Sequence, residues 1–230
     1  MFRFAEFHRT VTAACLGVWA VLSVVFVVTA PPLDAPATAD GPAFAAAVSA
    51  HAFLWSQGAL IVGVLGVAHL LRRRTPVVVA VAAACTTVGA IGHAAFAGIE
   101  FVRGSGGAGA ADAVQAAVDG SAGIVALVAL TGTAVGILTL AIALFRAKQG
   151  QAWVAALLVA WLIVEFGLSG MGLWAMLLSA ATLVAAGGGL AAMVARSDVR
   201  FWATAHEVGA PRAHEEDDSR GGARARSPRL

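Results

Sequence analysis

Charged residues and cysteines are scarce in this chain. Only 12% of its 230 residues are charged, whereas 60% are hydrophobic and the mean hydropathy is +0.84. Such a composition excludes an ordinary water-soluble globular domain. The two cysteines, Cys15 and Cys85, both fall inside apolar stretches, where a thiol acts as a small apolar side chain, so no disulfide is expected.

Several motifs of soluble enzymes are also missing. The sequence has no glycine-rich phosphate-binding loop, so coupling to ATP by this chain is not expected. It has no closely spaced pair of histidines or cysteines to bind a metal, and no repeat that would relate its halves as in an inverted-repeat transporter. Lys148 is the one lysine, and the many Arg, Ala, Gly and Val residues indicate a bacterial origin.

Six long apolar stretches account for most of the chain. Each is close to the roughly 20 residues that cross a bilayer core as a helix. The stretches are continuously apolar, without the alternation of a β-barrel, and a bilayer accepts only helices or closed barrels. The sequence therefore predicts an all-α membrane protein with six transmembrane helices. They run over Val11–Thr29, Ala52–Leu71, Val77–Phe96, Gly123–Phe145, Ala152–Leu168 and Gly172–Ala195.

The positive charges predict the orientation of these helices. Successive connections between the helices lie on alternate sides of the membrane. Apart from the C-terminal tail, this places nine basic residues on one side and Arg103 alone on the other. Cytoplasmic segments carry the excess of Lys and Arg, so both termini are expected in the cytoplasm. The membrane is expected to be the inner (plasma) membrane of the cell. The nine are Arg3, Arg9, Arg72, Arg73, Arg74, Arg146, Lys148, Arg196 and Arg200.

The chain divides into three predicted regions. Residues 1–10 are expected to form a cytoplasmic interfacial segment, 11–200 the six-helix domain, and 201–230 a disordered cytoplasmic tail that is rich in charge. The first apolar run is longer than the core of a signal peptide, so we expect it to be retained. Four tryptophans are expected at the membrane boundaries, Trp55 and Trp174 outside and Trp153 and Trp202 inside.

Five polar residues are predicted in the outer half of the spans. Ionisable groups there are costly, so each one calls for a reason. Counted along the helices, they fall at comparable depths, which predicts an outward-facing binding or proton-transfer cluster with Glu165 as the carboxylate and His93 as its partner. The stripe of small residues that contains Gly89 and His93, and the pair Gly132 and Gly136, predict close helix packing. The five are His51, Gln57, His93, Glu100 and Glu165.

Other interpretations of these residues remain open. In the structural interpretation the residues have no functional role: Glu165 reaches the nearby outer membrane interface, and His93 forms a hydrogen bond with a backbone carbonyl. In another, His51 and His93 bind a metal or haem, because they fall at similar depths on two helices.

A third interpretation concerns the sequence Gly167-Leu-Ser169-Gly170, which resembles the G-x-S-G motif of rhomboid intramembrane proteases. The resemblance implies Ser169 as a nucleophile. It covers four residues, and the last span lacks the histidine that rhomboids carry after the serine-bearing span. A tight glycine-containing turn explains the motif more simply.

Taken together, these features predict a non-enzymatic membrane protein. We expect a small transport or partner-binding component with no cofactor. Its partners would be the lipid bilayer and a second copy or another membrane protein, and no nucleic acid.

Overall fold

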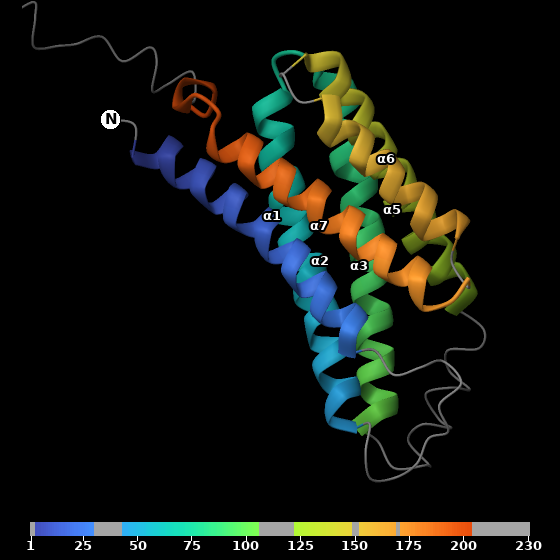
Figure 1. Ribbon diagram of the computed structural model, residues 1–230. Helices are drawn as coiled ribbons and strands as arrows, with labels where there is room; N and C mark the ends of the chain where they lie inside the picture. The colour runs from blue at the N-terminus through green and yellow to red at the C-terminus, as the bar shows by residue number, and fades with distance from the viewer. Residues whose placement is uncertain (1–2, 30–42, 106–121, 149–151, 169–170, 204–230) are drawn as a thin grey trace, which may run out of the picture.

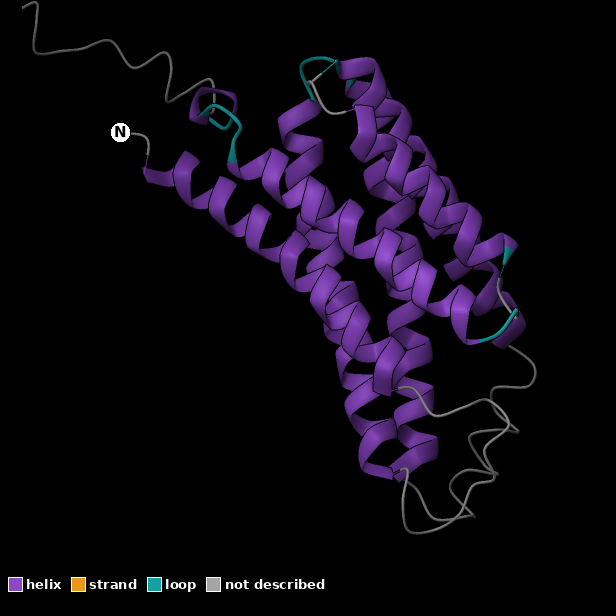
Figure 2. Ribbon diagram, viewed as in Figure 1, coloured by secondary structure: helices purple, strands orange, loops and turns teal. Residues whose placement is uncertain are grey.

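The structure is a computed structural model that describes residues 3–29, 43–105, 122–148, 152–168 and 171–203. The described residues are all helical apart from short turns, which confirms that the fold is all-α (Figure 2). The described ranges contain six α-helices, followed by one 3-10 turn. They are α1 (Arg3–Thr29), α2 (Ala43–Leu71), α3 (Pro76–Ser105), α5 (Ala122–Ala147), α6 (Ala152–Gly167), α7 (Leu173–Ala195) and η1 (Val199–Phe201).

Five of the six helices are long and apolar enough to cross a membrane. The exception is α6, which has 16 residues and is about 24 Å long at 1.5 Å per residue, short of a hydrocarbon core of about 30 Å. Helices α2 and α3 extend past their predicted spans: α2 starts at Ala43, in a flank rich in the strong helix former alanine, and α3 continues to Ser105. Residues 3–10 are part of the continuous helix α1.

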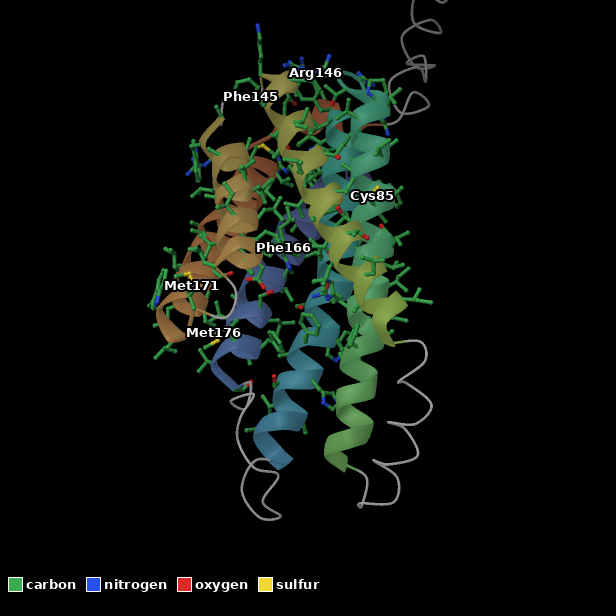
Figure 3. All side chains as sticks on the ribbon, turned by 90° about the vertical axis from the view of Figure 1, so that its right-hand side faces the viewer. Cys85, Phe145, Arg146, Phe166, Met171 and Met176 are labelled. Carbon is green, nitrogen blue, oxygen red and sulfur yellow. The ribbon has the colours of Figure 1, made fainter. Side chains whose placement is uncertain are left out.

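The helices form an up-and-down ring in which each packs against its neighbours in sequence, and α7 packs back on α1 (Figure 1). We call the end of the bundle where α1 begins and α7 ends the terminal end, and the opposite one the distal end. The turn between α2 and α3 also lies at the terminal end. At the distal end α2 and α3 extend beyond the turn between α6 and α7; in Figure 3, Met171 and Met176 lie short of their ends.

Small residues set the closest helix contacts. A Cβ atom added to Gly132 on α5 would lie 2.7 Å from the backbone nitrogen of Gly89 on α3, and one added to Gly136 would overlap Thr86. These glycines let the two backbones approach, which confirms the packing role predicted for them. Their neighbours, Thr86 and Thr133, are buried, and their hydroxyls have no hydrogen-bond partner among the described residues.

The residues after α7 fold back on the terminal end. Trp202 is 2% exposed; its ring stacks on His69 of α2 with centroids 5.8 Å apart, and its indole N–H donates to Ser197 at 2.8 Å. Arg9 of α1 donates to the Ser197 carbonyl at 3.1 Å. Trp202 lies at the terminal end, the predicted inner side, but it is buried against His69 instead of being exposed there. Residues 204–230 of the predicted tail lie outside the described residues.

The large apolar core occupies the half of the bundle nearer the terminal end. Its last layer toward the distal end holds Trp19 of α1 and Trp161 of α6, which meet edge to face with ring centroids 6.2 Å apart. Among the described residues, no buried Leu, Ile, Val, Met or Trp lies beyond this pair. The core includes Leu16, Leu60, Val64, Val67, Leu71, Ile137, Leu140, Val154, Leu158, Leu183, Leu190 and Val194.

Candidate functional site

Glu165 lies on the face of α6 that is turned to the interior. The buried residues of α6 are Val154, Ala155, Leu158 and Trp161. Glu165 follows Leu158 by seven residues and Trp161 by four, so it lies in the same row along the helix. Its side chain is nevertheless exposed, because the apolar core ends at Trp161.

The Glu165 carboxylate has a buried partner on the next helix. The Ser179 hydroxyl of α7 donates a hydrogen bond to it. Ser179 is 7% exposed and shares the inward face of α7 with Ala175 and Leu183. The hydrogen bond therefore joins the end of α6 to the inward face of α7. The structural interpretation, in which Glu165 reaches the nearby interface, stays an alternative, because the side chain is exposed and lies two residues before the end of α6.

Further polar side chains lie at the same level along the bundle axis, on other helices. Ser23 follows Trp19 on α1 by four residues, as Glu165 follows Trp161, so both lie about 6 Å from the tryptophans toward the distal end. On α2, Ser56 and Gln57 occupy this level, and the Gln57 amide donates to the Ser56 hydroxyl at 3.2 Å. Ser23, Ser56 and Gln57 are all buried.

Helix α5 contributes to the same level. Its Thr133 packs against Gly89 of α3, four residues before His93, and its buried hydroxyl has no partner among the described residues. We call Ser23, Ser56, Gln57, Thr133, Glu165 and Ser179 the polar layer. It comprises residues from five of the six helices, and the sixth, α3, is represented there by glycine.

A row of aromatic rings lies about one helical turn beyond the polar layer, toward the distal end. Phe26 of α1 stacks on Phe53 of α2 with centroids 4.5 Å apart, and the His93 ring of α3 meets Phe53 edge to face at 5.5 Å. All three side chains are half-buried. The Ser49 hydroxyl donates to the Phe26 carbonyl at 3.5 Å and ties α1 to α2 at this level.

The five predicted site residues do not lie together in the structure. Gln57 and Glu165 share the polar layer, and His93 belongs to the adjacent aromatic row. His51 is exposed, and its Nδ1 lies 2.7 Å from the Ala47 carbonyl of its own helix. Glu100 belongs to α3, but its side chain lies outside the described residues, as does Ser169.

The metal interpretation gains no geometric support. Within the described part of the chain, no group of three or more His, Cys, Asp or Glu side chains is placed to hold a metal ion. His93 instead contacts the ring of Phe53.

Sequence reasoning missed the partner of the carboxylate. Ser179 looks like any other serine of an apolar helix, and only the pairing of α6 with α7 singles it out. The spacing of Trp161 and Glu165, four residues apart, was a usable signal, since it places an acid directly beyond a large buried ring on one helix face.

Comparison of the chain with known protein families, with curated proteins and with solved structures found no match. The class of the protein follows from the fold itself. An all-helical bundle with five helices long and apolar enough to cross a membrane is that of a helical membrane protein.

Proposed function

We propose that this chain is a small six-span transport component of a bacterial plasma membrane, with both termini in the cytoplasm. It would bind its solute from the outer side at the polar layer, with Glu165 as the group that gains and releases a proton. In this proposal α6 also crosses the membrane, antiparallel to α5 and α7, which brings the number of spans to six. Helix α6 is shorter than the other spans, and its distal end lies at the level of the polar layer.

The distribution of charge supports the orientation. All nine basic residues predicted on the cytoplasmic side lie at the terminal end of the bundle, in the first turns of α1, the turn between α2 and α3, the end of α5 and the residues after α7. Arg146 marks this end in Figure 3. Arg103, which is not one of these nine, lies near the distal end of α3. An excess of basic residues at one end is the pattern of a cytoplasmic face.

The exposed Glu165 on an inward helix face carries the proposal. A carboxylate in this position is expensive unless it serves a binding or proton-transfer step. It lies on the distal side of the Trp19–Trp161 pair, and the large apolar core lies on the other side. In an alternating-access cycle, Glu165 would be reached from one side of the membrane at a time. The Trp19–Trp161 contact is the barrier that would have to open.

The terminal end is tied together by hydrogen bonds to backbone carbonyls. Arg74, in the turn before α3, donates to the Ala147 carbonyl at the end of α5, and Arg9 donates to that of Ser197. Each contact joins neighbours in the ring, α3 with α5 and α1 with α7, and would hold these pairs together on the cytoplasmic side.

Carbodiimide labelling tests the role of Glu165. Dicyclohexylcarbodiimide reacts with protonated carboxyls that it reaches through an apolar environment. In protein reconstituted into phosphatidylcholine vesicles, we expect mass spectrometry to find the adduct on Glu165, and labelling to decline as the pH rises because the ionised carboxylate does not react.

The matched control is Glu6→Gln, which removes an exposed acid at the terminal end. Labelling should persist in Glu6→Gln and disappear in Glu165→Gln. A wild-type protein that takes up no label at Glu165 would contradict the proton-exchange role.

A further inference from the structure

The surroundings of Glu165 indicate what kind of solute the site binds. We infer that it is a monovalent organic cation with apolar substituents, held by the carboxylate of Glu165 and by the indole ring of Trp161, one turn before it on the same face of α6. This inference rests on the proposed function, since it concerns the ligand of the same site.

The charge of the site selects the sign of the ligand. Among the acidic side chains that the structure describes, Glu6 and Asp198 lie at the terminal end, and Glu165 alone lies within the bundle. The described Lys and Arg side chains are all at the terminal end, so none of them neutralises this carboxylate. A charge in an apolar surrounding requires a compensating partner. A ligand with one positive charge supplies it, whereas an anion would add a second negative charge.

An indole ring lies next to the carboxylate along α6. Trp161 is one turn away toward the terminal end on the same helix face, and Trp19 packs edge to face against it. Cations are attracted to the faces of Trp rings, and organic ammonium groups are recognised in this way. The apolar part of such a ligand would lie against this pair of rings.

The oxygen atoms near Glu165 are too few for an inorganic cation. Calcium needs six to eight oxygen ligands, and magnesium an octahedral set with several waters. The described side chains near the carboxylate supply one hydroxyl, from Ser179, and no second acid. A single carboxylate beside an indole ring matches an organic cation better.

A pair of ions with the same shape and opposite charge provides the test. We would titrate the full-length protein in detergent with tetraphenylphosphonium and, separately, with tetraphenylborate, by isothermal titration calorimetry. We expect saturable binding of the phosphonium and none of the borate. Equal heats from both ions would overturn the inference, because they would show apolar partition without recognition of charge.

Two sets of variants locate the site. Glu165→Gln should weaken phosphonium binding by about tenfold or more, and Glu6→Gln should leave it unchanged. Trp161→Leu should weaken it several-fold, and Trp161→Phe, which keeps a ring, should restore most of the affinity. Affinity equal to wild type in Glu165→Gln would overturn the inference.

A protection experiment needs no variant and separates the two proposals. Saturating tetraphenylphosphonium should block carbodiimide labelling of Glu165 in the wild-type protein. Labelling that is undiminished by the phosphonium would overturn the inferred ligand class and leave the proposed proton exchange standing. An unlabelled Glu165 would refute the proposed function first, and the inference would fall with it.

Discussion

The indole rings of Trp19 and Trp161 meet edge to face, 6.2 Å apart, although α1 and α6 are not neighbours in the ring of helices. The contact crosses the interior and separates two different packing regimes. On the terminal side the buried side chains are mainly Leu, Val and Ile, and on the distal side they are Ser, Ala, Thr and Gln. Helix contacts in a membrane depend on close packing. The helices can therefore change their packing more easily on the distal side, where the buried side chains are small or polar.

Loss of the Ser179 hydroxyl should affect Glu165 directly. Ser179→Ala leaves the carboxylate without its donor, and we expect a loss of stability of about 0.6–2 kcal/mol, the range of hydrogen bonds between membrane helices. Thermal unfolding of the purified protein measures this. In a double-mutant cycle with Glu165→Ala the two effects should not add, because both changes remove the same bond; strict additivity would count against the bond.

Glu165→Gln should perturb function or stability more than Glu100→Gln. Glu165 is the acid farther from the predicted outer boundary, and it shares the polar layer with Gln57. A thermal-shift assay together with a growth assay compares the two variants. Negligible effects of both would remove a functional polar cluster from consideration.

The α3–α5 contact should tolerate no added methyl group at Gly89. A Cβ there would lie 2.8 Å from the carbonyl carbon of Gly132, so Gly89→Ala should destabilise the protein by about 1–3 kcal/mol. Gly98 on the same helix has nothing within 4 Å of such a Cβ, so Gly98→Ala should be neutral or stabilise by up to about 1 kcal/mol. Both values come from thermal unfolding in one detergent, and equal values would show that the close approach is unimportant.

Trp202 should be important for stability despite its place after the last helix. Trp202→Ala removes a fully packed indole and its hydrogen bond to Ser197, and a loss of about 3–5 kcal/mol is expected. The comparison is Trp174→Ala, since that ring is 52% exposed and its removal should cost much less. Should the two variants unfold at the same temperature, Trp202 would be no more than a surface residue.

The proposed orientation can be tested with single cysteines that leave every charge in place. In a background with Cys15 and Cys85 replaced by Ala, Thr38→Cys lies in the segment between α1 and α2, and Ser219→Cys lies after η1. A membrane-impermeant maleimide applied to intact cells should label Thr38→Cys and should label Ser219→Cys only after lysis. The opposite pattern would invert the topology.

Several features were predictable because they depend on residues close in sequence. Hydropathy and length located all six helices, although α2 begins before and α3 ends after the predicted spans. The glycines of α3 and α5 indicated close packing before any partner was known. The burial of Trp202 was not predictable, because it depends on the way the chain folds back against His69 and Arg9.

The sequence by itself determined that the chain is helical and apolar, where its helices lie, and which end carries the positive charge, because each of these is a property of one segment. Only the tertiary structure decided which side chains meet. Glu165 and Ser179 lie 14 residues apart on adjacent helices, and Trp19 and Trp161 lie on helices that are not adjacent. No local pattern encodes such contacts, because they depend on how the faces of six helices pair around one interior.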